Sequence, residues 1–285
     1  ELEDAVYKPD HIEAVRTEIA DTFPYCFQSF AQRPLRPVFK NEIEAYEKER
    51  DVYREYLDLR ALEEFEYDPN AFKSYSRSRC PIIRRCLMSR DEVMKDYQKS
   101  FNLVSGRELL DTVRNIAEFG KHYVADFDDE AHIQADSYTD LGLEPLNERE
   151  YQCYGVVGYG VQSSMLYGLY SRNFAHRSQN AVWALYFLSQ RKDFGLEDGS
   201  EFLMVHPDYG TCEQNYFYPA ELFGFYALKV YLRLKSACED RNVRFDEAYR
   251  YCYLSAFLDH VADTHREDIN MFRISSTDRE SRGWY

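Results

Sequence analysis

The stretch from Cys153 to Leu188 reads CYGVVGYGVQSSMLYGLYSRNFAHRSQNAVWALYFL. Its first half holds four of the chain's twelve glycines, at Gly155, Gly158, Gly160 and Gly168, whereas residues 1–105 contain none. Glycine among apolar and aromatic residues normally lowers stability, so each position indicates a tight turn or a close backbone approach. The pattern predicts a helix, a hairpin and a second helix, then a loop and a third helix that begins at Ser178.

Most of the remaining chain has the apolar spacing and capping signals of helices. The predicted helices are His11 to Phe23, stopped by Pro24, then Asn41 to Glu66, Arg90 to Phe101, Gly106 to Phe119, stopped by Gly120, Asn147 to Gly155, Pro219 to Arg241 and Phe245 to His265. The prolines at 34 and 37 predict an extended connection over Gln28 to Phe39. Glu201 to His206 is the best strand candidate.

The fold class that follows is mainly α: a multi-helix globular protein, with at most one minor strand pair. We expect an N-terminal helical region over residues 1–145, which includes a basic segment at 69–90, and a C-terminal helical core over 146–285, which includes the hairpin at 156–164. Of the 285 residues, 45% are hydrophobic and 16% aromatic, which is ample material for a core.

Composition also bears on location and partners. The chain has seven cysteines and no CxxC pair, which predicts reduced thiols in a cytoplasmic protein. No apolar run approaches the roughly 18 residues of a membrane span, so we expect no membrane partner. The net charge of -15 argues against wholesale coating by nucleic acid and requires any phosphate contact to be local.

The clearest local charge is positive and lies between Pro69 and Arg90, where no acidic residue occurs. Its candidate phosphate-binding residues are Arg77, Arg79, Arg84 and Arg85, interleaved with serines and aromatic residues. Arginine forks and hydroxyl groups are suited to phosphate oxygens. The alternative is that these arginines pair with the acidic helix that precedes them.

The opposite charge gathers between His122 and Asp136. His122, Asp126 and His132 are candidate metal ligands there, because carboxylates and imidazoles coordinate divalent ions. Their spacing matches no known ligand pattern, and the alternative is a solvated acidic loop. We therefore expect no metal and no cofactor.

Residues Val156 to Leu166, VVGYGVQSSML, carry the pattern apolar, any, Gly, apolar, Gly, followed by small residues that open a helix. This segment resembles the helix-hairpin-helix family of DNA-binding elements. The resemblance implies that backbone amides of the hairpin and the second helix face a phosphate, as helix N-termini do. The implied contacts are Gly158, Gly160, Val161, Gln162 and Ser163, with Arg172 and Arg177 as nearby charges. The alternative is that the glycines mark a close crossing of helices.

Catalysis has weaker support in the sequence. Glycosylases built on this hairpin carry a downstream Asp and some carry a Lys, but Gln162 takes the place of the Lys and residues 173–179 contain no acid. The segment Arg172 to His176 is similar to the R-N-x-x-x-H signature of HEPN ribonucleases but is one residue shorter. Arg172 and His176 are thus the candidate catalytic residues of a nuclease.

Three hypotheses follow from these patterns. The first is a non-catalytic or weakly catalytic helical protein that binds the backbone of DNA or RNA. The second is a helical subunit of a larger complex that meets a protein partner. The third is a His-dependent nuclease or a metal-dependent hydrolase.

Overall fold

The computed structural model describes residues 3–91, 94–192, 194, 201–206, 211–216 and 218–272. The fold is mainly α, which confirms the prediction from the sequence. Two short strands, β1 (Leu203–His206) and β2 (Thr211–Gln214), pair antiparallel, with Leu203 opposite Gln214. The helices are α1 (Glu3–Val6), α2 (Pro9–Phe30), α3 (Leu35–Tyr56), α4 (Leu59–Glu64), α5 (Pro69–Arg79), α6 (Pro81–Met88), α7 (Met94–Leu103), α8 (Gly106–Ala125), α9 (Asp129–Gln134), α10 (Tyr159–Leu169), α11 (Gln179–Leu188), α12 (Ala220–Glu239) and α13 (Arg250–Thr264).

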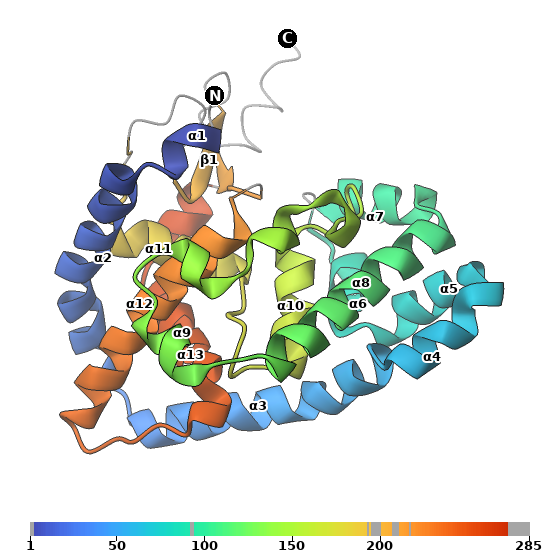
Figure 1. The fold of residues 1–285 in the computed structure, drawn as a ribbon. Helices are drawn as coiled ribbons and strands as arrows, with labels where there is room; N and C mark the ends of the chain where they lie inside the picture. Colours follow the sequence, from blue (N-terminus) through green and yellow to red (C-terminus); the bar gives the residue numbers. More distant parts are fainter. Residues whose placement is uncertain are drawn as a thin grey trace, which may run out of the picture.

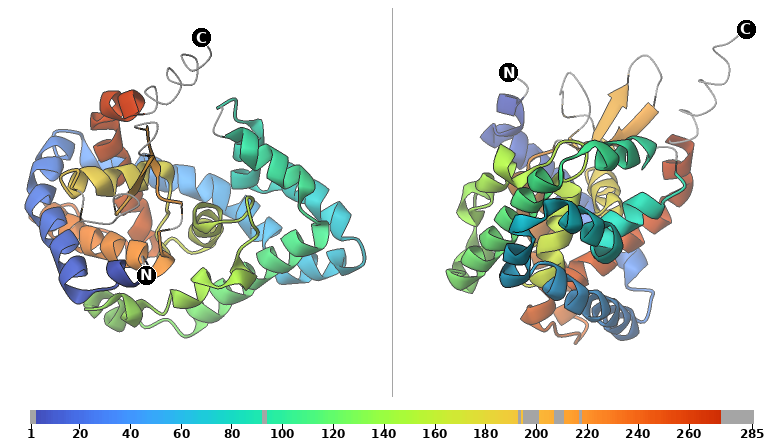
Figure 2. Two further views of the ribbon diagram at one scale, coloured as in Figure 1. Left: turned by 90° about the horizontal axis from the view of Figure 1, so that it is seen from above. Right: turned by 90° about the vertical axis from the view of Figure 1, so that its right-hand side faces the viewer.

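The long helix α3 runs along the base of the molecule and joins two groups of helices (Figure 1). One group contains α2, α11, α12 and α13, and the other contains α4 to α8. Helix α10 stands between the groups and packs against α3, α6 and α8. Seen from above, the two groups lie on opposite sides of α10 (Figure 2).

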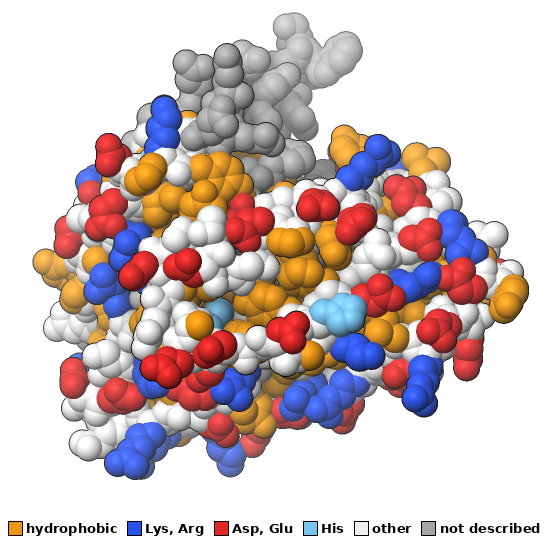
Figure 3. All heavy atoms as spheres, in the orientation of Figure 1, with side chains coloured by type: hydrophobic (Ala, Val, Ile, Leu, Met, Phe, Trp, Pro, Cys, Tyr) orange, Lys and Arg blue, Asp and Glu red, His pale blue; other side chains and the backbone are white. Residues whose placement is uncertain are grey.

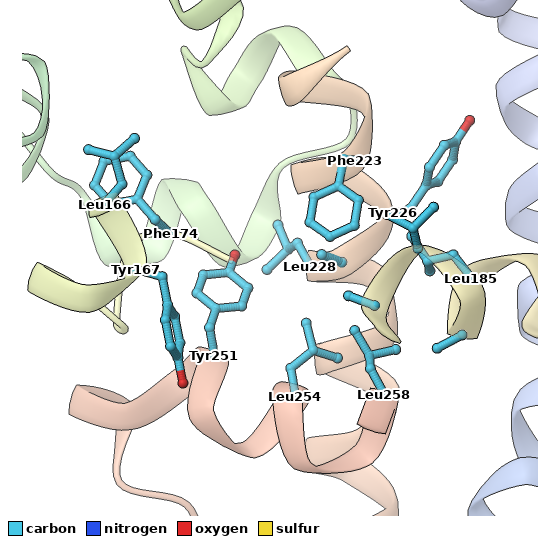
Figure 4. Packing of buried hydrophobic residues seen from close by; sticks show 14 of the residues in the cluster. Leu166, Tyr167, Phe174, Leu185, Phe223, Tyr226, Leu228, Tyr251, Leu254 and Leu258 are labelled. Carbon is cyan, nitrogen blue, oxygen red and sulfur yellow. The ribbon is translucent and has the colours of Figure 1, made fainter. Parts of the chain in front are cut away.

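One cluster of buried apolar side chains extends through both groups. In the part of it shown in Figure 4, Leu228 of α12 lies between Leu185 of α11 and Tyr251 of α13, and Tyr167 of α10 lies beside Tyr251. Side chains from both sides of residue 145 belong to this cluster. The division into regions 1–145 and 146–285 stays a prediction about how the chain is organised, but the two regions share one core.

The sequence predicts that prolines near the N-terminus interrupt helices, but in the structure they do not. Pro24 lies inside α2, although an interior proline typically costs about 3 kcal/mol. Phe23 directly precedes Pro24, and Phe30 ends the helix. Their ring centroids lie 5.3 and 5.4 Å from that of Phe257 on α13, and this burial offsets the cost of the proline. The extended connection predicted over Gln28 to Phe39 is also wrong, because α3 already begins at Leu35.

Local capping signals are confirmed where their helices form. The Ser105 hydroxyl accepts a hydrogen bond from the Glu108 amide at 3.0 Å, and the Ser178 hydroxyl accepts one from the Ala181 amide at 3.1 Å. The single helix predicted over Asn41 to Glu66 ends instead at Tyr56, and Asp58 caps α4. Helix α8 runs on past Gly120.

The helix predicted over Asn147 to Gly155 is wrong. The 3-10 turn η4 (Arg149–Tyr151) lies in this part of the chain, and two more, η2 (Tyr138–Leu141) and η3 (Glu144–Asn147), lead up to it. The Asn147 side chain has a distant partner, since its oxygen accepts from the Ala220 amide at 3.1 Å and its nitrogen donates to Glu221 at 2.5 Å. It therefore secures the start of α12 rather than a helix of its own.

Close packing explains one of the glycines in α10. A Cβ atom at Gly168 would lie 2.3 Å from the ring of Tyr53, which is buried on α3. At Gly160 the nearest atom would be the carbonyl oxygen of Arg177, at an ordinary 3.7 Å. The alternative of a close helix crossing thus holds at Gly168, whereas Gly160 has room for a side chain.

We expect Gly168→Ala to lower the free energy of unfolding by about 1–3 kcal/mol, because the Tyr53 ring has no space to retreat. Gly160→Ala is the matched control in the same helix and should be at least as stable as the wild type, since Ala favours helix. Urea unfolding followed by circular dichroism measures both. Equal stability of the two variants would contradict this packing.

Candidate functional site

A hollow of about 610 Å³ opens between the C-terminal half of α8, helix α9 and the turns η2 and η4. Apolar side chains are exposed at the centre of this face, with acidic side chains and histidine beside them (Figure 3). The lining residues that carry the later argument are Glu118, Phe119, Tyr123, Asp126, Phe127 and Tyr151.

The floor of the hollow is a row of aromatic rings. Tyr151 meets Phe119 edge to face with centroids 5.7 Å apart, and Phe119 stacks on Tyr123 at the same distance. Tyr123 and Phe127 follow at 5.9 Å, and Phe127 lies 5.0 Å from the ring of His132. All but His132 are partly exposed. Rings in this arrangement present negative faces and a large apolar area to a ligand.

The rim of the hollow is acidic. Its charged lining residues are Glu118, Asp126, Asp128, Asp140 and Glu150, and no Lys or Arg belongs to the lining. Asp128 and Asp140 also accept hydrogen bonds from backbone amides of their own turns. Glu118 and Asp126 are exposed, and within the described part of the chain neither has a cationic partner. The hollow therefore combines negative charge with aromatic surface.

A second hollow, of about 700 Å³, adjoins the first along the N-terminal half of α8. The two share Asn115 and Glu150 in their linings. The Asn115 side chain donates to the Glu150 carbonyl at 3.0 Å and ties α8 to η4 at the junction. The second hollow is lined by polar side chains, among them Arg107, Glu148 and Arg149.

Buried charges hold α9 in place at the edge of the first hollow. Arg250 is fully buried and donates to Asp129 of α9, to Glu247 and, at 3.1 Å, to the carbonyl of Arg172. Burial of the Asp129 carboxyl acts to raise its pKa, but the bonds from Arg250 and Arg172 prevail and hold that pKa below its usual value. The network therefore stays charged at neutral pH.

The three candidate metal ligands all line the first hollow, but they do not converge. His132 is only 4% exposed, and its Nε2 atom lies 2.9 Å from the hydroxyl of Tyr251. Burial and the neighbouring Arg250 lower the pKa of His132 to about 3. In the described ranges, no group of three or more His, Cys, Asp or Glu side chains is placed to hold a metal ion. His122 and Asp126 stay exposed on the rim.

The hairpin residues lie at the start of α10: Gly158 precedes its first residue, and Gly160, Val161, Gln162 and Ser163 lie in its first turns. Gly158 is exposed and Val161 is buried. The Gln162 amide donates to the Gly158 carbonyl at 3.0 Å, so this amide already has a partner within α10, and its role as a phosphate contact stays a prediction. The Gln162 side chain is 1% exposed and donates to the Leu146 carbonyl. The Ser163 hydroxyl accepts from the Arg177 amide at 3.0 Å.

The candidate arginines do not form one surface. Arg85 pairs with Glu49 of α3 at 2.5 Å, as the alternative prediction has it, and Arg77 donates to the Asn102 side chain at 2.9 Å. Arg172 pairs with Asp129 at 3.4 Å. Arg177 is buried, and this burial lowers its pKa to about 10.

Arg79 and Arg84 differ from these, because they are exposed and have no acidic partner in the described ranges. They lie on α5 and α6, in the second group of helices (Figure 1). They are the arginines that remain open to an anionic ligand.

Arg172 and His176 have separate surroundings. The His176 ring stacks on Tyr167 with centroids 4.9 Å apart, and its Nε2 atom lies 3.0 Å from the Ser164 hydroxyl. Burial lowers the pKa of His176 to about 4. Arg172 contacts Asp129 instead, so among the described residues the two candidate catalytic residues have no hydrogen-bond or ion-pair partner in common. Their catalytic role stays a prediction.

Sequence reasoning missed the aromatic floor. Phe119, Tyr123 and Phe127 recur every fourth residue, which places them on one helical face, and this signal was present in the sequence. The missing information was that η4 lies across from α8 and brings Tyr151 beside them.

The fold and the hollow thus define an α-helical protein with an acidic, aromatic-floored surface recess. In the parts of the chain that the structure describes, no helix has the length and apolar character needed to cross a membrane. Comparison of the chain with protein-family models, curated protein sequences and solved structures gives no match.

The buried His132 predicts a pH dependence of stability. Its pKa of about 3 in the folded protein lies below the ordinary value of 6.5, so the unfolded chain takes up the proton first as pH falls. The stability gained from keeping His132 neutral is present above pH 6.5 and is lost progressively as the pH falls toward 3. Between pH 7 and pH 5 we expect wild type to lose about 2 kcal/mol more than His132→Gln, as measured by urea unfolding. Parallel pH profiles of the two proteins would refute the assignment.

Proposed function

We propose that this protein binds a partner protein through the hollow between α8 and α9. The observation that carries the proposal is the aromatic row of Phe119, Tyr123, Phe127 and Tyr151, which lies partly exposed in a recess. Aromatic side chains anchor protein interfaces because they bury a large area when a partner covers them. The volume of about 610 Å³ is enough to take one or two side chains of such a partner.

The support beneath the recess also suits binding. Tyr123 donates its hydroxyl to the Leu141 carbonyl at 2.8 Å, and this bond holds η2 against α8. Arg250 fixes α9 through Asp129. A recess that is already formed loses less conformational entropy on binding than one that must be assembled.

We expect the indole of Ala131→Trp to fill the hollow and to lower the affinity for a co-purifying partner at least tenfold, because Ala131 is exposed in the lining of the hollow. Ala125→Trp is the control, since Ala125 is also exposed but lies outside the lining. Affinity is measured with the partner purified from the wild-type complex. A partner that binds both variants equally would overturn the proposal.

A second proposed function is contact with the backbone of DNA or RNA through Arg79 and Arg84. It rests on the absence of an acidic partner for these two exposed side chains in the described ranges. Arginine guanidinium groups bind phosphate through paired hydrogen bonds. Because the whole chain carries a charge of -15, such contact would be confined to this surface.

For this function we expect Arg79→Gln plus Arg84→Gln to weaken binding to single-stranded and duplex oligonucleotides and to reduce the salt slope by about 2. The control removes the same charge from two arginines that already have acidic partners, Arg54→Gln plus Arg266→Gln. Fluorescence anisotropy across a salt series measures both. Equal losses in the two double variants would leave only a general charge effect and contradict the site.

A further inference from the structure

The two hollows follow a single helix. The first is lined by residues from the C-terminal half of α8, the second by residues from its N-terminal half, and Asn115 and Glu150 belong to both. Helix α8 has 20 residues and is therefore about 30 Å long. A fully extended chain of that length has about nine residues.

We infer that the two hollows form one groove that binds an extended segment of a partner protein bearing Arg or Lys side chains. The inference rests on the proposed function, because it names the kind of partner that the first hollow accepts. One cationic side chain of the segment enters the α8–α9 hollow, and its main chain passes Asn115 into the second hollow.

Charge and ring chemistry select the cation. Glu118 and Asp126 have no cationic partner in the described part of the chain, and the lining of the first hollow contains no Lys or Arg. A guanidinium binds a carboxylate through its fork and packs flat on an aromatic face, here that of Phe119 or Tyr123. An anionic ligand such as a nucleic acid would be repelled by the same rim.

The second hollow selects an extended chain over a small cation. A single small cation would occupy only part of the first hollow and leave the adjoining 700 Å³ unused. The polar lining there, which includes Glu148 and Gln152, can exchange hydrogen bonds with a peptide backbone. The charged lining there holds four carboxylates, of Glu108, Asp111, Glu148 and Glu150, and two arginines, Arg107 and Arg149, so it is acidic on balance. Arg107 pairs with Glu66 at 2.5 Å, which leaves Arg149 as the cation that a basic segment must pass.

The probe is a fluorescein-labelled nonapeptide with Arg at its second position and Ser at the other eight, so that it carries the same side-chain charge as the shorter control peptide, and its binding is followed by fluorescence anisotropy. We expect the peptide with Glu in place of Arg not to bind, and the tripeptide Ser-Arg-Ser to bind at least tenfold more weakly. Glu148→Gln should weaken the nonapeptide and leave the tripeptide unchanged, because only the longer peptide reaches the second hollow. A tripeptide that binds as tightly as the nonapeptide overturns the groove.

Two double variants distinguish binding at this site from a general attraction of the basic peptide to an acidic protein. Glu118→Gln plus Asp126→Asn should weaken the nonapeptide about tenfold, whereas the control Glu63→Gln plus Glu64→Gln changes the net charge equally on α4 and should cost less than about twofold. Phe119→Leu keeps an apolar side chain but removes the ring, and should weaken binding roughly threefold to tenfold. Equal losses in the two charge variants overturn the inference.

The partner experiment distinguishes the two levels of the argument. If Ala131→Trp releases the natural partner but the nonapeptide neither binds nor competes with it, the proposed function stands and the basic segment is wrong. If the partner is retained by Ala131→Trp, the proposed function itself fails. Circular dichroism and urea unfolding of every variant establish that the fold is intact.

Discussion

The burial of one arginine is the constraint on which the candidate site depends. Arg250 is fully buried at the start of α13, and moving such a charge out of water costs several kcal/mol unless partners compensate it. The compensation comes from distant parts of the chain: Asp129 of α9, Glu247 before α13 and the carbonyl of Arg172 after α10. Moving any of these segments away removes one partner from a buried charge, which is costly. The requirement to satisfy Arg250 therefore fixes where α9 meets the core.

That fixed position leads directly to the aromatic row. The Arg250 guanidinium lies 6.0 Å from the ring centre of Phe127, and the ring of the buried His132 lies 5.0 Å from the same centre. Phe127 is thus held at the end of the row that continues through Tyr123 to Phe119. Phe119 and Tyr123 already pack on the buried ring of Phe174, with centroids 6.2 and 4.8 Å apart, so the space beneath the row is filled and the rings stay partly exposed. An aromatic surface that cannot collapse inward is available to a partner.

The sequence predicted those features whose causes are local. The caps at Ser105 and Ser178 and the helical class depend on neighbours a few residues away, and they are confirmed. The predicted helix end at Pro24 is wrong, because burial of Phe23 and Phe30 against α13 outweighs the local cost of the proline. Of the residues around the hollow, the sequence indicates only the acidic segment between His122 and Asp136. The aromatic floor depends on η4 lying beside α8, a contact between distant parts of the chain. The every-fourth-residue spacing of Phe119, Tyr123 and Phe127 is compatible with a shared face, but it does not indicate whether that face is covered.

The two proposed functions differ physically because the unpaired negative and positive charges lie on different elements. Carboxylates such as Glu118 and Asp126 gather around a recess, whereas Arg79 and Arg84 lie on α5 and α6. Where opposite charges do meet across elements, as Arg85 and Glu49 do, they pair and lose most of their effect on a ligand. The unpaired charges keep their fields, and each field selects ligands of the opposite sign. Since aromatic surface accompanies only the acidic set in a recess, apolar burial adds to charge there. The groove is for this reason the stronger candidate of the two surfaces.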